Sequence, residues 1–143
     1  MSTNRAFTVL LVDDDDIDAE SVIRGLKKNN VDSHVIRAHD GIEALEIMNG
    51  EHGDAPLQRP YLILLDINMP RMNGLELLSE IRKDDRLRDS IVFMLTTSDS
   101  HEDKLAAYKL NAAGYINKVN VGPNFTSAAR LIDEYRMAVT LPE

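Results

Sequence analysis

Residues 8–20 have the sequence TVLLVDDDDIDAE, in which a short apolar run leads directly into four consecutive aspartates. The run is rich in Val and Leu, as in a buried β-strand. Neighbouring carboxylates repel one another, so a strand that ends in this way needs a function or a structural partner for its charge. The rest of the sequence supplies candidates for both.

The composition of the chain is typical of one soluble globular domain. Its 143 residues suffice for one well-built core, and 43% of them are hydrophobic while 28% are charged. No apolar run approaches the ~18 residues that a membrane helix needs, and residues 1–7 lack the apolar core of a signal peptide. The chain has no cysteine, which fits a reducing compartment, so we expect a cytoplasmic protein without membrane contact. A net charge of −8 argues against direct nucleic-acid binding.

Strand-like and helix-like segments alternate along the chain. Apolar runs predict β-strands at residues 7–12, 33–38, 61–65, 91–95 and 114–117. Apolar residues with helical spacing follow each run: Ala19, Val22, Ile23 and Leu26; Ile42, Leu45 and Met48; Leu75, Leu78 and Ile81; Leu105, Ala106 and Ala113; Phe125, Ala128, Ile132, Tyr135 and Val139. This alternation predicts an α/β fold, with a doubly wound parallel sheet between two helix layers. We expect a single domain over residues 1–143, with its core at about 7–139.

Polar side chains follow four of the predicted strands. Asp13 and Asp14 follow the first strand, Asp66 the third, Thr96 the fourth and Lys118 the fifth. In an open parallel sheet, ligands bind outside the carboxyl ends of the strands. Carboxylates that converge there repel one another, and a hard divalent cation with oxygen ligands relieves this repulsion. We therefore expect a Mg²⁺ site built from the strand-end aspartates.

The second half of the aspartate run has a structural explanation. Asp15 and Asp16 fall where the first predicted helix begins, and carboxylates at that position cap free N–H groups and favour the helix dipole. Capping-box spacing also marks the starts of the second and third helices, at Asp40 with Glu43 and at Asn73 with Glu76.

Several segments resemble the receiver domains of bacterial two-component response regulators. They are LLVDD at residues 10–14, LLDINMPRMNGLELL at 64–78, FMLTTS at 93–98 and AAGYINK at 112–118. The acid pair, the phosphoacceptor segment, the threonine and the lysine occur in the order typical of the family, from about residue 7 to residue 139. The resemblance implies the flavodoxin-like (βα)5 fold with strand order 2-1-3-4-5, a topology for which this family is a known example.

The resemblance also implies a phosphorylation site and a metal site. Asp66 would be the nucleophile that takes a phosphoryl group from a phosphohistidine of a sensor histidine kinase. Asp14, Asp66 and the backbone carbonyl of Asn68 would hold Mg²⁺ directly, while Asp13 would act mostly through a bound water.

Three further residues would bind the phosphoryl group and report its presence. The Lys118 ammonium would neutralise phosphoryl charge, and Thr96 would donate its hydroxyl to a phosphoryl oxygen. The ring of Tyr115 would then move inward and change the surface of the fourth helix, fifth strand and fifth helix. The residues alone leave simpler roles open: Thr96 could be an ordinary strand end, Thr97 is equally placed, and Tyr115 could serve packing only.

The chain departs from the family pattern after Lys118. A cis-proline usually follows this lysine, whereas Val119 follows it here, and a non-proline cis bond costs about 2.5–4 kcal/mol. We expect either a trans bond or a strained cis bond.

The segments RPYLILLDINMP, LTTS and AVTLPE resemble the small response regulators linked to bacterial phytochrome kinases. They imply a phytochrome-type histidine kinase as partner and a homodimer through the face of the fourth helix, fifth strand and fifth helix.

Two alternative functions remain from the sequence. A Mg²⁺-dependent phosphatase with an aspartate nucleophile would need a second aspartate where Asn68 stands, so we expect no enzyme. A constitutive scaffold would normally lack one of the residues needed for phosphorylation, and the acid pair, the nucleophile, the hydroxyl and the lysine are all present here.

The few residues after the last predicted helix leave no room for an output domain, so the output is expected to be a dimer switch, a docked effector or onward phosphotransfer.

Overall fold

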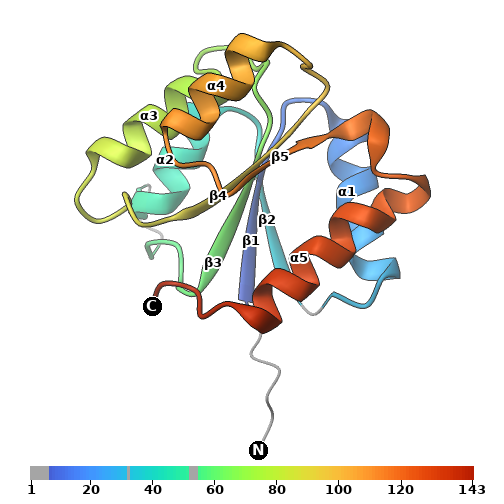
Figure 1. The fold of residues 1–143 in the computed structure, drawn as a ribbon. Helices are drawn as coiled ribbons and strands as arrows, with labels where there is room; N and C mark the ends of the chain where they lie inside the picture. Colours follow the sequence, from blue (N-terminus) through green and yellow to red (C-terminus); the bar gives the residue numbers. More distant parts are fainter. Residues whose placement is uncertain (1–6, 32, 52–54) are drawn as a thin grey trace, which may run out of the picture.

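Five parallel strands form one sheet in the order β2-β1-β3-β4-β5 in the computed structural model, which describes residues 7–31, 33–51 and 55–143 (Figure 1). The strands are β1 (Phe7–Val12), β2 (Ser33–Ala38), β3 (Tyr61–Leu65), β4 (Ile91–Thr96) and β5 (Gly114–Asn117). The predicted order is confirmed. The predicted strand bounds agree with the structure, except that β4 extends one residue further, to Thr96.

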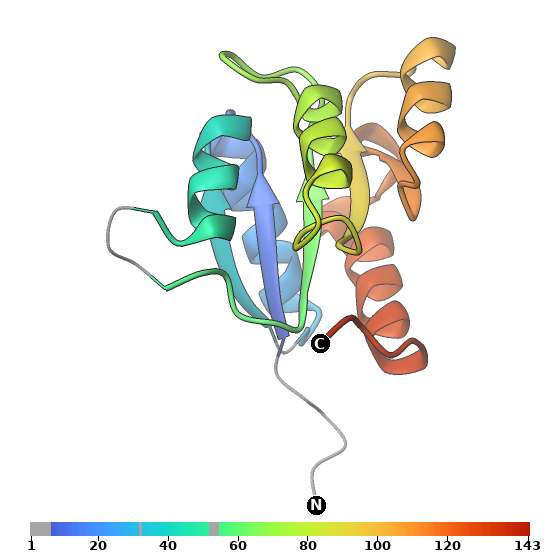
Figure 2. The same ribbon diagram turned by 90° about the vertical axis from the view of Figure 1, so that its left-hand side faces the viewer.

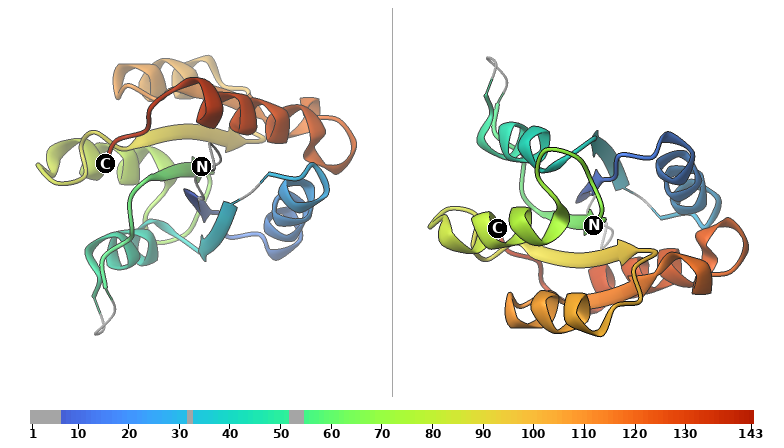
Figure 3. Two further views of the ribbon diagram at one scale, coloured as in Figure 1. Left: turned by 90° about the horizontal axis from the view of Figure 1, so that it is seen from below. Right: turned by 90° about the horizontal axis from the view of Figure 1, so that it is seen from above.

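Helices cover both faces of the sheet, which confirms the doubly wound α/β class (Figure 1, Figure 3). One face carries α1 (Asp16–Lys28) and α5 (Thr126–Ala138). The other carries α2 (Gly41–Asn49), α3 (Gly74–Lys83) and α4 (His101–Lys109), which lie side by side in Figure 2. Two short 3-10 turns, η1 (Lys118–Asn120) and η2 (Pro123–Phe125), connect β5 to α5. Within the described residues, no helix has the length and apolar character needed to cross a membrane.

The sheet is buried on both sides by two apolar cores. Along β1, Val9 and Leu11 pack into the core beneath α1 and α5. Leu10 and Val12 pack into the core beneath α2, α3 and α4. Because successive side chains of a strand point to opposite faces, a central strand between two helix layers must be apolar throughout. This explains the uninterrupted apolar run that precedes the aspartates.

The fourth helix is shorter than its predicted apolar set. Ala113 lies outside α4, which ends at Lys109, so its assignment to the helix was wrong. The Ala113 N–H instead donates to the carbonyl of Val92 at 2.7 Å, because the chain has already turned towards β4. In the last predicted set, Phe125 and Val139 flank α5 as its N-cap and C-cap residues.

The two predicted capping boxes differ in the structure. Asn73 and Glu76 form the complete reciprocal box at the start of α3. Asp40 caps α2 by accepting from the N–H of Glu43 at 2.9 Å. The Glu43 carboxylate, however, accepts from the N–H of His39 rather than from that of Asp40, so only half of the second box is present.

The loop between β3 and α3 passes very close to Asp66, the residue that follows β3. The Gly74 N–H donates to the carbonyl of Ile67 at 2.9 Å. A Cβ atom at Gly74 would lie 2.0 Å from the carbonyl oxygen of Asp66, closer than any side chain tolerates. The absence of a side chain at Gly74 therefore lets the loop fold back over Asp66.

We predict that Gly74→Ala lowers the free energy of unfolding by about 2–3 kcal/mol, because the new Cβ meets backbone that cannot move independently. Gly41→Ala is the matched control, since Gly41 also begins a helix but would meet the side chain of Met72. We expect a smaller loss there because that side chain can shift. Urea unfolding measures both, and equal losses would contradict the explanation.

Candidate functional site

The carboxylates predicted to bind a metal meet at the ends of β1 and β3. Val12 is paired with Leu65 in the sheet, which brings the following residues, Asp13 and Asp66, next to each other. Asp13 and Asp66 are buried, whereas Asp14 is exposed. One oxygen of each of these three carboxylates lies within 4.8 Å of the others. The structure therefore brings together the three aspartates that the sequence singled out.

Lys118 extends from the end of β5 into this group of carboxylates. Its Nζ donates to Oδ2 of Asp13 at 2.7 Å and to Oδ2 of Asp66 at 3.1 Å. Burial lowers the pKa of Lys118, but the hydrogen bond with Asp13 and the charge of Asp66 outweigh burial and raise it above its ordinary value of 10.5. The side chain therefore stays an ammonium at neutral pH and partly offsets the clustered negative charge.

Asp18 is a third partner of Lys118, and the sequence analysis did not identify it. Its Oδ2 lies 3.0 Å from the Lys118 Nζ. Asp18 lies in the first turn of α1, where a carboxylate also interacts favourably with the helix dipole. The contact joins residues 100 positions apart, so no local sequence signal could have predicted it.

The carboxylates of Asp13, Asp14 and Asp66 have the chemistry of a site for a hard cation. Oδ1 of Asp13 accepts from the N–H of Asp15 at 3.0 Å, and Oδ1 of Asp66 accepts from the N–H of Ile67 at 2.7 Å. Burial raises the pKa of Asp13, and the hydrogen bond from Lys118 opposes this shift. Because the candidate donors are all carboxylate oxygens, they suit Mg²⁺, Mn²⁺ or Ca²⁺ better than zinc.

The second half of the aspartate run has the structural role expected of it. Asp15 is the N-cap of α1 and accepts from the N–H of Asp18 at 2.9 Å. Asp16, the first residue of the helix, pairs with Arg37 of β2 at 2.6 Å. The four adjacent aspartates therefore have different environments, which reduces the repulsion within the run but leaves the carboxylates of Asp13 and Asp14 close together.

Thr96 and Tyr115 are linked through the backbone of Ser98. Thr96 is fully buried at the end of β4, and its hydroxyl oxygen accepts from the N–H of Ser98 at 3.2 Å. The Tyr115 hydroxyl donates to the carbonyl of Ser98 at 2.9 Å. Thr97, the alternative hydroxyl, is exposed. Ser98 thus joins the predicted phosphoryl-binding threonine to the predicted reporting ring, a connection that residue types alone did not indicate.

Two further predictions concern the loops around the site. The Lys118–Val119 peptide is trans, and the chain continues into the turn η1, where the Asn117 side chain accepts from the Val119 N–H at 3.0 Å. Asn68 lies exposed in the loop after Asp66. The metal-binding role of its backbone carbonyl stays a prediction.

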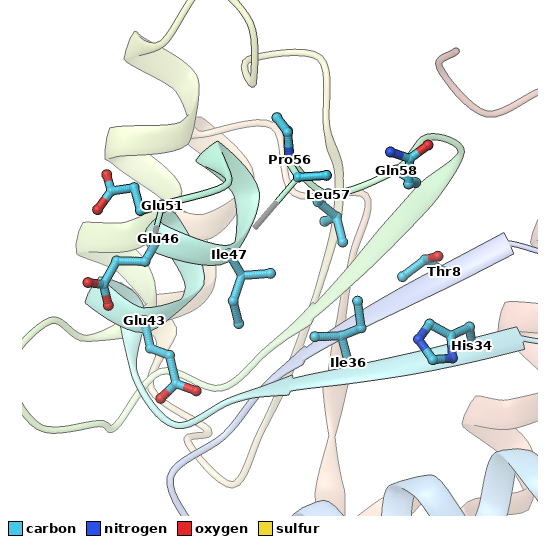
Figure 4. A pocket seen from close by; sticks show the side chains of 11 residues that line it. Thr8, His34, Ile36, Glu43, Glu46, Ile47, Glu51, Pro56, Leu57 and Gln58 are labelled. Atoms are coloured by element: carbon cyan, nitrogen blue, oxygen red, sulfur yellow. The ribbon is translucent and has the colours of Figure 1, made fainter. Parts of the chain in front are cut away.

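A separate hollow of about 440 Å³ lies between β2, α2 and the segment that precedes β3 (Figure 4). Ile36, Ile47 and Leu57 form its apolar wall. None of the predicted site residues lines it. The candidate site is therefore the charged cluster at the strand ends and not this apolar hollow.

Comparisons with known proteins agree with this geometry. The family model described as "Response regulator receiver domain" matches residues 9–130. Response regulator Rcp1 of Synechocystis sp. is 34% identical over 143 residues, covering 98% of this chain and 96% of its own. The Mn²⁺-bound structure of Rcp1 has a TM-score of 0.83 at 32% identity, covering 95% of this chain and 99% of that one.

A second similar structure is the phosphorylated cyanobacterial phytochrome response regulator RcpA. It has a TM-score of 0.82 at 34% identity and covers 95% of this chain and 98% of its own. Together with the matched family model and the order of the strands, these similarities identify the family of the protein. The chain belongs to the response regulator receiver domain family and is a receiver protein of two-component signalling.

Proposed function

We propose that this receiver accepts a phosphoryl group on Asp66 from a sensor histidine kinase, with Mg²⁺ bound, and thereby changes a protein-interaction surface. The observation that carries the proposal is the environment of Asp66. Its carboxylate lies among oxygens that can share a divalent cation and within 3.1 Å of the Lys118 ammonium. Phosphoryl transfer needs an aligned nucleophile and positive charge beside the phosphoryl oxygens, and this arrangement supplies both.

Asp14, Asp66 and the backbone carbonyl of Asn68 would hold Mg²⁺ directly, with Asp13 acting through a water. The close approach of the carboxylates of Asp13, Asp14 and Asp66 supports this assignment, as does the Mn²⁺-bound form of the similar protein Rcp1. Bound Mg²⁺ would neutralise charge on the phosphoryl oxygens during transfer. The Lys118 ammonium would neutralise charge on the same oxygens.

We propose that residues 7–139 act as one receiver domain and not as a hydrolytic enzyme. Asn68, two residues after Asp66, has no carboxylate with which to serve as an acid or base. This argues against an aspartate-nucleophile phosphatase. The clustering of the acid pair, the nucleophile and the lysine, with Thr96 at the end of the adjacent strand β4, argues against a constitutive scaffold.

We further propose that the upstream partner is a phytochrome-type histidine kinase in the cytoplasm. The similarity to a phosphorylated phytochrome response regulator supports this partner. The absence of cysteine from the chain is consistent with a reducing compartment.

The proposed switch begins at Thr96. If its hydroxyl turns towards a phosphoryl oxygen, it gives up the contact with the N–H of Ser98, whose carbonyl holds the Tyr115 hydroxyl. A change at the phosphorylation site therefore reaches the ring of Tyr115 through one residue of backbone. The equilibrium between two positions of the hydroxyl and the ring is what phosphorylation would bias.

Intact-protein mass spectrometry after incubation with acetyl phosphate tests the central proposal. We expect one acid-labile phosphoryl group on the wild-type protein with Mg²⁺, and none without Mg²⁺ or on Asp66→Asn. The isosteric amide retains the shape of the side chain but is not a nucleophile. No gain of mass, together with no binding of Mg²⁺ or beryllofluoride, would favour the scaffold instead.

We predict that Thr96→Ala separates phosphorylation from the switch. The nucleophile and Lys118 are unchanged in this variant, so Asp66 still accepts phosphate, but the signal to Tyr115 is lost. Fluorotyrosine NMR measures the signal: beryllofluoride shifts the Tyr115 resonance, assigned with Tyr115→Phe, in the wild-type protein but not in Thr96→Ala. Thr97→Ala, which alters the exposed neighbour, retains the shift. A shift in Thr96→Ala as large as in the wild type would refute this route.

We propose that the face of α4, β5 and α5 forms a homodimer whose strength depends on phosphorylation. Leu105 and Tyr108 on α4 are 49% and 53% exposed, and Leu131 on α5 is 44% exposed, which leaves apolar area for a partner. Light scattering should show a higher average mass after beryllofluoride treatment. Leu105→Glu should abolish the increase because a charge then enters the contact, and an unchanged mass in the wild type would contradict the dimer switch.

A further inference from the structure

The Lys118 ammonium is surrounded by three carboxylates. Its Nζ lies 2.7 Å from Asp13, 3.0 Å from Asp18 and 3.1 Å from Asp66. The side chain is 12% exposed, so water has little access to the charge. An ammonium has three N–H donors and no acceptor. The three carboxylates therefore satisfy all of its donors and fix its orientation.

Two of these carboxylates change their role when the proposed reaction takes place. Asp66 becomes the phosphorylated group, and its carboxylate charge is replaced by the charge of the phosphoryl oxygens. Asp13 belongs to the carboxylate group that can share a metal ion, and Asp18 does not. Asp18 is therefore the partner of Lys118 whose charge and position are the same before and after phosphorylation.

Lys118 also borders open space into which its side chain could move. A hollow of about 290 Å³ lies between α1 and η2, and Asp18, Arg24 and Lys118 are in its lining. Asp18 is the one carboxylate among the described residues of that lining. Without Asp18, a Lys118 ammonium released from Asp66 would have only the positive charge of Arg24, and no carboxylate, in the lining of the hollow.

Asp18 itself is held in place by the start of α1. Its backbone N–H donates to the capping side chain of Asp15 at 2.9 Å, which fixes the first turn of the helix. Its side chain is 43% exposed, so its charge remains solvated while one oxygen contacts Lys118. A carboxylate on a fixed helical turn costs little to keep in this position.

We propose that Asp18 is a positioning residue that holds the Lys118 ammonium beside the phosphoryl group during transfer to Asp66. This inference rests on the proposed function. In the reaction with acetyl phosphate, the P–O bond to acetate breaks, a bond from phosphorus to a carboxylate oxygen of Asp66 forms, and acetate leaves. Asp18 takes no part in these bonds. It acts through Lys118, which must meet the phosphoryl oxygens at the right place.

The test compares Asp18→Ala with Asp16→Ala. Both variants remove a carboxylate from the first turn of α1, but Asp16 pairs with Arg37 and not with Lys118. We expect Asp18→Ala to slow phosphorylation by acetyl phosphate about tenfold, which is typical when the partner of a site residue is removed. Asp16→Ala should remain close to wild type. Mass spectrometry over time gives the rates, and circular dichroism verifies that both variants are folded.

A second measurement separates positioning from damage to the metal site. The affinity for Mg²⁺ without a phosphodonor, from calorimetry, should be the same in the two variants, because Asp18 is not among the metal-binding carboxylates. Asp18→Asn, which keeps an oxygen for the Lys118 hydrogen bond but loses the charge, should fall between Asp18→Ala and wild type. If Asp18→Ala does not fold, the rate of Asp18→Asn provides the test instead.

The outcomes distinguish this inference from the function on which it rests. If the wild-type protein accepts phosphate and Asp18→Ala does so at the rate of Asp16→Ala, the inference is wrong and the proposed function stands. If Asp18→Ala loses Mg²⁺ affinity in proportion to its rate, positioning of Lys118 is also rejected. If the wild-type protein accepts no phosphate and binds neither Mg²⁺ nor beryllofluoride, both proposals fail.

Discussion

The contacts of Lys118 with the carboxylates after β1 and β3 are the interactions on which the functional end of the sheet depends. Parallel pairing of Val12 with Leu65 places Asp13 beside Asp66, both of them buried. Burial of two neighbouring negative charges is unfavourable unless a positive charge accompanies them. Lys118 provides that charge from the other side of β4, so β5 must lie in the same sheet and end at the same edge. The strand order and the chemistry are therefore linked.

The connection from this end of the sheet to the surface uses few atoms. The Ser98 N–H donates to the Thr96 hydroxyl, and the Ser98 carbonyl accepts from the Tyr115 hydroxyl. The backbone of one residue therefore connects two side chains from adjacent strands. Its hydroxyl donates to Asp103 of α4 at 2.6 Å. The loop after β4 thus contacts the site, β5 and α4 together, which makes it a suitable element for a two-state change.

The sequence predicted the fold well because local signals agreed with the tertiary arrangement. The middle strands were apolar throughout and the strand ends carried the reactive side chains, so the strand order implied by the family resemblance was enough to bring Asp13, Asp66 and Lys118 together. Ala113 was misplaced because the fourth helix has few buried apolar residues and weak periodicity. Asp18 and the link that Ser98 makes between Thr96 and Tyr115 were missed for other reasons. The partner of Asp18 is distant in sequence, and Ser98 acts through backbone atoms that every residue type possesses.

The structure also answers why a strand can end in four aspartates. Asp13 faces Lys118, Asp14 faces solvent beside the candidate metal site, Asp15 caps α1, and Asp16 pairs with Arg37. The repulsion is thus relieved at three of the four positions by groups that the fold supplies. At the end of the sheet it is not fully relieved, since one ammonium serves the three carboxylates of Asp13, Asp18 and Asp66. A ligand that brings positive charge to this place binds only the folded chain and so stabilises it, which couples the stability of the domain to the occupancy of its site.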